Sequence, residues 1–248
     1  MTYCLAIKLD EGLVFCSDSR TNAGPDQVST YSKMHRFSVA EDRQLVILTA
    51  GNLATSQAVV DQIGWDIQSD STFNFGKAAH IAEVADYVGL LSREQQKKYV
   101  DEDTPKLGYK PQASFIVGGQ IKGSPPELYL VYPEGNHIRT SEQHPFLQIG
   151  ETKYGKPILD RVIRQTSSHE IAMRCALVSM DSTMASNATV GPPVELLYYR
   201  TDSLSKPAKY YQFDDSDPYW VLLRESWDEK IQESFSQLPP VRDSDEAN

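Results

Sequence analysis

Thr2 is the residue whose position in this chain most directly suggests chemistry. It follows Met1, so removal of that methionine would make Thr2 the N-terminal residue. Its hydroxyl, a nucleophile, would then sit beside its own α-amine, which is one recognised way to activate a weak hydroxyl nucleophile. A free α-amine has a pKa near ~7.7–8.0, so an appreciable fraction is neutral at physiological pH and accepts the hydroxyl proton. Thr2 therefore offers a nucleophile together with its own base.

The elements that follow Thr2 bring an acidic side chain toward it. Residues 3–7 and 13–16 are apolar runs separated by Asp10-Glu11-Gly12, a pattern that predicts two strands joined in a tight β-hairpin. A hairpin returns the end of its second strand to the chain terminus. We therefore expect Asp18, at the end of that strand, to lie near Thr2.

A lysine and a glycine come next in the chain. Lys33 precedes two short predicted strands, and Gly51 follows them at the start of a predicted helix. Taken alone, Asp18 and Lys33 favour an ordinary surface ion pair, because such pairs are common and contribute little. The alternative is an active-site pair serving Thr2, and the wider pattern decides between the two.

The order of these residues resembles the β-type subunit of the proteasome, a family of N-terminal threonine peptidases. In that family a strand that begins with Thr leads to an Asp-Ser-Arg sequence, then to a lysine, then to an Ala-Gly-Gly-like turn that opens the first helix. The spacing from Thr2 to Lys33 is one residue shorter than usual, which the loop at 22–27 can absorb. The corresponding residues here are Thr2, Asp18-Ser19-Arg20, Lys33 and Ala50-Gly51-Asn52.

The resemblance continues to about residue 200 with less specific motifs. Ile149-Gly150-Glu151 resembles a Val-Gly-Ser-Gly segment, with Glu151 where a serine is usual. Segment 180–187 resembles the helix end that supplies an Asp and a Ser to the site, and two alignments compete there. One equates Asp181 with the family's Asp. The other, which we prefer, puts Thr183 in its place and Ser186 at the Ser, because this segment also resembles the bacterial HslV peptidase. The segment after Ile149 and the long C-terminus look most like the bacterial proteasome homologue Anbu.

The resemblance, joined to residue chemistry, implies a mechanism and reverses the surface-pair interpretation. Thr2 Oγ attacks a scissile carbonyl, and its α-amine takes the proton directly or through water. Lys33 lowers the cost of forming the alkoxide, and Asp18 holds Lys33 in its charged form. The Gly51 N–H is the expected oxyanion donor, worth about 3–4 kcal/mol in comparable sites.

The same resemblance implies how a substrate would lie. Asn22 and Gly51 would pair with an extended substrate as an added strand. The pocket for the leading side chain looks small and uncharged, which favours apolar residues. The residues that would line it are Thr21, Tyr31, Thr49 and Leu53; the further catalytic candidates are Arg20, Glu151, Asp181, Thr183 and Ser186.

Composition excludes several classes of function. A net charge of −10 over 248 residues argues against a nucleic-acid-binding protein, because phosphates attract basic patches. No run reaches the ~18 apolar residues of a membrane span, and no signal peptide precedes Thr2, so we expect neither a membrane nor export. Three cysteines in apolar runs are typical of reduced core thiols in a cytoplasmic protein. The histidines are scattered singly, so we expect no metal and no cofactor.

The remaining elements alternate in blocks. Their order suits two antiparallel sheets between helical layers, and the resemblance makes this an α+β, four-layer αββα sandwich of the Ntn-hydrolase class. Gly118-Gly119 is read as a turn and 101–105 as a loop. Predicted helices cover 54–67, 77–91, 157–165 and 169–180; predicted strands cover 36–39, 44–48, 113–117, 127–132, 137–140 and 194–199.

The C-terminal section adds one more helix. Asp217-Pro218 is a good helix start, with Asp as N-cap and Pro at the first helical position. An apolar stripe follows, and it suits either packing on its own subunit or an anchor between subunits. The stripe is Trp220, Leu223, Trp227 and Ile231; the expected division is 2–204 for the Ntn-hydrolase domain, 205–238 for the extension and 239–248 for a flexible acidic tail.

These observations predict a proteasome-type threonine hydrolase that cleaves peptide or amide bonds through an acyl-enzyme on Thr2. It is expected to assemble with itself into a ring or spiral, with an unidentified regulator or unfoldase as a further partner. Two alternatives stay open: an Ntn amidase for a small amide, and a self-assembling scaffold without turnover. Glu151 in place of serine and Thr183 in place of aspartate leave room for the scaffold.

Overall fold

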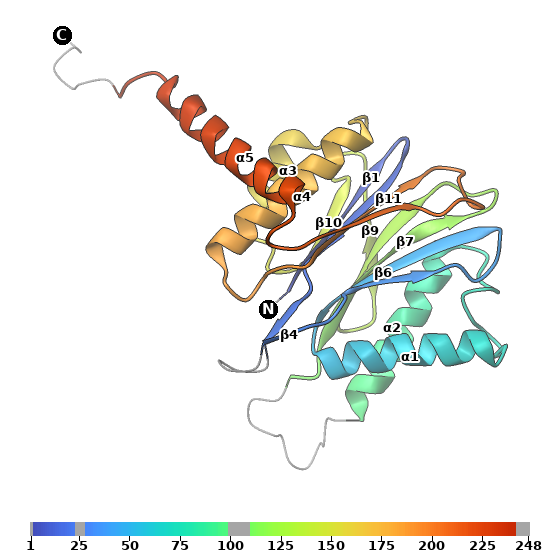
Figure 1. The fold of residues 1–248 in the computed structure, drawn as a ribbon. Coiled ribbons are helices and arrows are strands. Elements are labelled where there is room, and N and C mark those ends of the chain that lie inside the picture. Colours follow the sequence, from blue (N-terminus) through green and yellow to red (C-terminus); the bar gives the residue numbers. More distant parts are fainter. Residues whose placement is uncertain (1, 23–27, 99–109, 242–248) are drawn as a thin grey trace, which may run out of the picture.

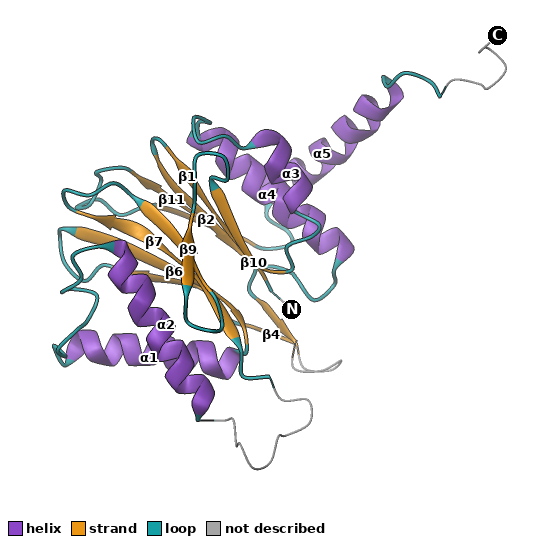
Figure 2. Cartoon of the chain, turned by 180° about the vertical axis from the view of Figure 1, so that it is seen from behind, coloured by secondary structure: helices purple, strands orange, loops and turns teal. Residues whose placement is uncertain are grey.

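Two five-stranded antiparallel sheets lie face to face between two layers of helices in the computed structural model, which describes residues 2–22, 28–98 and 110–241 (Figures 1 and 2). The α+β, four-layer sandwich predicted from the sequence is confirmed. The first sheet has the order β10-β1-β2-β11-β12 and the second the order β5-β6-β7-β8-β9.

Each sheet is assembled from strands far apart in the sequence. The first contains β1 (Tyr3–Leu9), β2 (Gly12–Ser17), β10 (Phe146–Gly150), β11 (Val194–Arg200) and β12 (Lys209–Phe213). The second contains β5 (Met34–Phe37), β6 (Arg43–Gly51), β7 (Ala113–Ile121), β8 (Glu127–Val131) and β9 (His137–Arg139). A small ribbon of β3 (Arg20–Asn22) and β4 (Val28–Thr30) leaves the end of the first hairpin.

The helices cover the outer faces of both sheets. α1 (Leu53–Gln68) and α2 (Ile81–Lys97) pack on the second sheet, and α3 (Lys156–Val162) and α4 (His169–Ser186) pack on the first. α5 (Pro218–Ser236) contacts α4 near its own start and then projects away from the body (Figure 1). No helix in the part of the chain that the structure describes is long and apolar enough to cross a membrane.

β1 shows why the N-terminal run is apolar at nearly every position. A strand points alternate side chains to opposite faces, and β1 lies in an inner layer covered on both. Cys4 and Ala6 face the second sheet, where they join the core between the sheets. The other face packs beneath α3 and α4, through Tyr3, Leu5, Ile7 and Leu9.

The predicted N-terminal hairpin is confirmed, with β1 and β2 paired from Cys4–Ser17 to Leu9–Gly12. The boundaries of other elements differ from the prediction. β5 begins at Met34, directly after Lys33, rather than at residue 36. α2 begins at Ile81 rather than residue 77, and α4 runs six residues beyond its predicted end to Ser186.

Gly118-Gly119 is not a turn, and that prediction was wrong. Both glycines lie inside β7, opposite Val46 and Leu45 of β6. A Cβ on Gly118 would overlap the side chains of Leu128 and Phe15, because the two sheets approach closely there. The glycines mark close approach within a packed strand, which the sequence pattern does not distinguish from a turn.

The C-terminal extension holds more than the predicted helix. β12 pairs with β11 and widens the first sheet, a strand that was not expected from the sequence. Asp217 does cap α5, accepting from the N–H groups of Tyr219 and Trp220. Trp220 is fully buried against the first sheet, whereas Phe235 near the end of α5 is 70% exposed. α5 is therefore anchored at one end only.

Some expectations fall outside the described residues. These are the loop at 101–105, most of the loop at 22–27, Met1, and residues 242–248 of the tail.

Candidate active site

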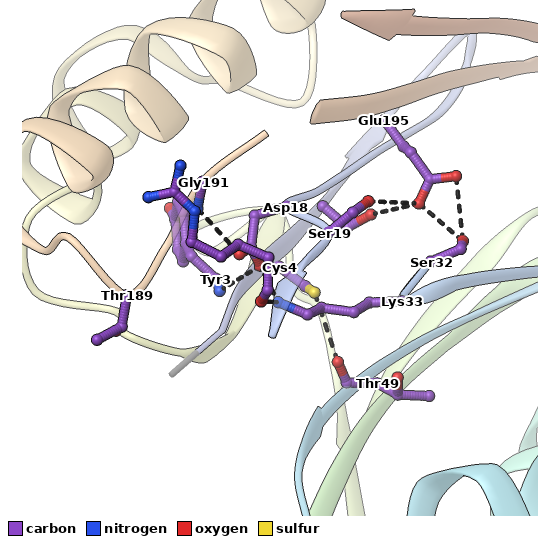
Figure 3. Close-up of polar contacts among 12 residues, drawn as sticks. Tyr3, Cys4, Asp18, Ser19, Ser32, Lys33, Thr49, Thr189, Gly191 and Glu195 are labelled. Atoms are coloured by element: carbon purple, nitrogen blue, oxygen red, sulfur yellow. Dashed lines mark hydrogen bonds and ion pairs between the residues drawn. The ribbon is translucent and has the colours of Figure 1, made fainter. Parts of the chain in front are cut away.

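Asp18 lies at the end of β2 and is completely buried. Its Oδ1 accepts from the Tyr3 N–H at 3.0 Å, and its Oδ2 accepts from the Gly191 N–H at 3.2 Å (Figure 3). The Tyr3 N–H belongs to the peptide group that Tyr3 shares with Thr2. The predicted hairpin therefore does bring Asp18 beside the start of β1.

Lys33 donates to Asp18 Oδ1 at 2.6 Å and to the Arg20 carbonyl oxygen at 2.7 Å. The Lys33 side chain is 6% exposed and the Asp18 side chain 0%, so the surface-ion-pair alternative is wrong. An ammonium has three donors, and these two bonds leave one. Lys33 also lines the pocket that Thr2 borders.

Burial raises the pKa of Asp18 above its usual value, because desolvation penalises the carboxylate. The Lys33 charge and the N–H donors of Tyr3 and Gly191 act in the opposite direction. A buried pair of this kind is stable only when both partners are present and well hydrogen-bonded. The pair is therefore stable only while the groups that bond Asp18 and Lys33 stay in place.

Thr2 is held by the neighbouring strand through its backbone. Its carbonyl oxygen accepts from the Glu151 N–H at 2.7 Å, and Gly150 packs directly against it. Gly150 has a φ of +84°, and a Cβ there would overlap the Thr2 carbonyl. The glycine of the Ile149-Gly150-Glu151 motif therefore makes room for Thr2.

A pocket of about 300 Å³ is lined by half of the predicted site residues. Thr2, Lys33 and Gly51 border it together, as do the predicted substrate contacts Thr21 and Thr49. Its full lining is Thr2, Arg20, Thr21, Lys33, Thr49, Ala50, Gly51, Asn52, Leu53 and Ser56. A larger pocket, of about 410 Å³, lies at the opposite end of the first sheet around Glu11 and His169, far from Thr2.

Gly51 ends β6 and directly precedes the N-cap of α1. Asn52 caps the helix by accepting from the Thr55 N–H at 3.1 Å, and its own N–H donates to the Gln112 carbonyl. A Cβ on Gly51 would crowd that same carbonyl of the neighbouring strand. The start of α1, with its positive end of the helix dipole, therefore faces the pocket close to Thr2.

Two of the further catalytic candidates, Arg20 and Glu151, lie close to this centre. The Arg20 guanidinium donates to the Ala188 carbonyl at 2.9 Å and packs against Gly191. Glu151 adjoins Thr2 through its backbone, while its side chain accepts from Asn187 at 3.3 Å. Arg20 contacts the pair through its carbonyl oxygen, which accepts from Lys33, and Glu151 contacts Thr2.

Other predicted residues lie away from the pair. Asp181 is bound by Arg224 of α5 at 2.7 Å, so its carboxylate faces the extension. The Thr183 hydroxyl is buried and donates to the Ser179 carbonyl within α4. Ser186 is exposed at the end of α4, and Tyr31 is 43% exposed and does not line the pocket. Asn22 lies in β3.

Sequence reasoning missed two residues that contact this centre. Gly191 donates to Asp18 from the loop between α4 and β11. Glu195 accepts hydroxyl bonds from Ser17, Ser19 and Ser32, which adjoin Asp18 and Lys33. A lone acid in an apolar strand was the available signal for Glu195. Among the described residues, no group of three or more His, Cys, Asp or Glu could hold a metal ion.

A family model for the proteasome subunit matches residues 2–198. Anbu (ancestral beta-subunit) from Yersinia bercovieri is 40% identical over 98% of this chain and 100% of its own, with a TM-score of 0.91. A helical assembly of the Anbu complex from Pseudomonas aeruginosa is 41% identical over 98% and 99%, also with a TM-score of 0.91. Anbu from Hyphomicrobium sp. strain MC1 is 36% identical over 98% and 100%, with a TM-score of 0.88. The comparison with curated proteins returned no match.

Gly150→Ala tests how closely Gly150 supports Thr2. We expect it to lower the free energy of unfolding by about 1–3 kcal/mol more than Gly123→Ala, because overpacking against a backbone is not relieved by a rotamer change. Gly123 is the matched control: its φ is +85°, but a Cβ there meets nothing within 4 Å. Denaturant unfolding at one protein concentration measures both. Equal losses would show that a Cβ fits at Gly150 without moving Thr2.

Proposed function

Because the chain belongs to the proteasome subunit family, we propose that it is an N-terminal threonine hydrolase that cleaves peptide or amide bonds. The observation that carries this proposal is the buried Lys33–Asp18 pair at 2.6 Å, whose lysine lines the pocket that Thr2 borders. A cation held in a desolvated site next to a hydroxyl stabilises the alkoxide formed in nucleophilic attack.

In the proposed reaction, Thr2 Oγ attacks the scissile carbonyl while the freed α-amine takes its proton. Lys33 stabilises the developing negative charge on Oγ, and Asp18 keeps Lys33 charged and in place. The Gly51 N–H stabilises the oxyanion of the tetrahedral intermediate. The amine then protonates the leaving group, and water, activated by the same amine, hydrolyses the acyl-enzyme. These reaction steps require that Met1 is removed, because they use the free α-amine of Thr2.

The pocket also supports a preference for small apolar side chains. Thr21, Thr49 and Leu53 contribute uncharged groups to its lining, and Ala50 adds a methyl group. An extended substrate would run along Asn22 and Gly51 as an added strand. The same pocket would accept the acyl part of a small amide, so an Ntn amidase stays the nearest alternative.

One observation favours a second candidate, a scaffold that assembles without turnover. Glu151 stands where the family usually has a serine, and its carboxylate is held by Asn187. We therefore keep Ser186, Glu151 and Thr183 as secondary proposals only, and leave Asp181 out of the catalytic group because Arg224 engages it.

Three buried free cysteines support the proposed cytoplasmic location.

Thr2 is tested by covalent labelling. We expect an epoxyketone or β-lactone probe to add to Thr2 of protein whose intact mass shows loss of Met1, and Thr2→Ala to abolish labelling. Burial raises the pKa of Cys4 well above its usual range, so this neighbouring thiol stays protonated and unreactive. Labelling that survives in Thr2→Ala, or retained Met1 in the purified protein, would sink the assignment.

Lys33 is tested by removing its charge. Lys33→Ala should lower the labelling rate by about 100-fold or more, and Lys33→Arg should also be poor, since a planar guanidinium does not replace a compact ammonium. Because the pair is buried, Lys33→Ala should also destabilise the fold by about 3–5 kcal/mol.

A double variant separates the two effects. Lys33→Met with Asp18→Asn removes both charges, so it should recover part of the lost stability without recovering reactivity; the Asn amide has only one oxygen to accept from the two N–H groups. Wild-type labelling rates in Lys33→Ala would contradict the proposed role.

We also propose that the chain forms a homo-oligomer in which α5 reaches a neighbouring copy. Beyond its anchored start, α5 exposes Leu222 and Phe235, and Leu238 follows just after the helix. Obligate interfaces bury roughly 2,000 Å² or more and use apolar and aromatic anchors. The relative from Pseudomonas aeruginosa is described as a helical assembly. A regulator or unfoldase is a further proposed partner, supported by family membership alone.

Truncation tests this assembly. Ending the chain at Glu225 keeps Trp220 and the Arg224–Asp181 bond but removes the projecting part of α5. We expect light scattering to show a shift from a large oligomer to smaller species. A chain ending at Val241 should keep the number of subunits of the full-length oligomer. An unchanged mass in the shorter chain would show that α5 does not join subunits.

A further inference from the structure

Glu195 is a buried carboxylate near the start of β11 in the first sheet. It lies on β11, is 5% exposed, and stands alone as an acid in the apolar run of that strand. The partners that the structure gives it are hydroxyl groups rather than a cation: within the described ranges, no Lys or Arg nitrogen lies within 4.0 Å. Burying a carboxylate is costly unless it is well hydrogen-bonded, so these hydroxyls explain how it is tolerated.

Three of the hydroxyls come from serines next to the buried pair. Glu195 Oε2 accepts from Ser32 at 2.8 Å and, over longer distances of 3.4 Å each, from Ser17 and Ser19 (Figure 3). Ser17 and Ser19 flank Asp18, and Ser32 immediately precedes Lys33. The partners of this carboxylate are thus concentrated on the two segments that carry the pair.

Strand geometry explains this placement for Asp18. In extended chain, alternate side chains point to opposite faces. Glu195 is directly opposite Ser17 across the β11–β2 pair. Ser17 and Ser19 therefore point toward Glu195, while Asp18 between them points the other way, toward Lys33. The carboxylate contacts one face of the segment whose other face carries the functional group.

Ser32 extends the contact to the second sheet. Its hydroxyl has one proton, and the shortest acceptor for it is Glu195 Oε2. Ser32 Oγ in turn accepts from the Met34 N–H at 3.3 Å, where β5 begins. Ser32 thus links Glu195, in the first sheet, to the backbone on either side of Lys33, in the second.

Tyr210 fixes the carboxylate from its other side. The Tyr210 hydroxyl of β12 donates to Glu195 Oε1 at 2.6 Å, and the Arg36 guanidinium lies over the Tyr210 ring at 4.2 Å. Both carboxylate oxygens are therefore engaged, and the group is held from two strands besides its own. A carboxylate held at both oxygens restricts where its serine partners can lie.

Resting on the proposed function, we propose that Glu195 is a positioning residue for the Lys33–Asp18 pair: it fixes the Ser17–Ser19 segment against the segment of Ser32, so that Lys33 and Asp18 meet at 2.6 Å. Catalytic groups need placement to within about 0.5 Å, and supporting hydrogen bonds provide it. Glu195 does not line the Thr2 pocket. Its loss should therefore slow reaction of bound probe without weakening probe binding.

The kinetic test measures two quantities in the full-length protein with an epoxyketone probe. One is the maximal rate constant of labelling, kinact, and the other is the probe concentration that gives half of that rate, KI. We expect Glu195→Ala to lower kinact by about 10- to 100-fold, the range for small misplacement of catalytic groups, with KI within about threefold of wild type. Glu195→Gln keeps one acceptor oxygen and should recover part of that loss. Ser32→Ala, at the protein surface, breaks only the link to Lys33 and should lower kinact several-fold in a fully folded protein.

Gln120→Ala is the matched control. Gln120 is 1% exposed and is also the centre of a buried polar network, bonded to Tyr199, Asp202 and Ser124. These contacts lie at the opposite end of the sandwich from Thr2. Its loss should lower the melting temperature as Glu195→Ala does, but leave kinact within twofold of wild type.

A crystal structure of Glu195→Ala provides a readout that needs no activity. We expect the Lys33 Nζ to Asp18 Oδ1 separation to lengthen beyond hydrogen-bonding range, about 3.5 Å. If wild-type protein is not labelled at all, the proposed function fails and this distance alone decides the positioning role. An intact 2.6 Å pair, or a Glu195→Ala kinact within twofold of wild type, overturns the proposal.

Discussion

The contact between Lys33 and Asp18 is the interaction around which this end of the molecule is organised. Two opposite charges removed from water cost several kcal/mol each, and their attraction offsets that only when the geometry is good and the remaining polar positions are filled. Here the N–H groups of Tyr3 and Gly191 complete Asp18, and the Arg20 carbonyl completes part of Lys33. Those donors and acceptors come from β1, β3 and the loop after α4. The buried pair therefore depends on the assembled sandwich, because an isolated hairpin would not supply all of these partners.

Because Asp18 ends a strand of the first sheet and Lys33 precedes one of the second, the distance between the sheets sets the distance between the charges. Small residues control that spacing elsewhere: at Gly118, a Cβ would overlap Phe15 across the core between the sheets. Glu195 acts nearer the pair by joining Ser32 to the strand that carries Asp18. Packing at Gly118 and the polar contacts of Glu195 thus constrain one quantity, the placement of the two sheets relative to each other, and the separation of the two charges depends on it.

Local structure, such as the N-terminal hairpin, could be predicted from the sequence, whereas contacts between residues far apart in the chain could not. The hairpin that returns Asp18 to Thr2 depends on two apolar runs and a short turn, so pattern alone predicts it. Gly191 lies 173 positions from Asp18 and Glu195 lies 178 positions from Ser17, and the sequence around Gly191 and Glu195 carries no sign of these contacts. Asp181 matched a family motif, yet its partner Arg224 lies on a helix that the motif does not include. Gly118-Gly119 was misread because a turn and a tightly packed strand both select glycine, for different physical reasons.

α4 connects the two parts of the molecule that the sequence treats as separate. On one side Asp181 of α4 binds Arg224 of α5, close to the buried anchor Trp220. At its end, Asn187 donates to Glu151, whose N–H holds the Thr2 carbonyl. Backbone hydrogen bonds within a helix hold its residues at fixed spacing. A displacement of α4 would therefore move both the Asp181–Arg224 contact and the Asn187–Glu151 contact. The placement of Thr2 and the placement of the projecting helix are therefore not independent: each is fixed against the same rigid element.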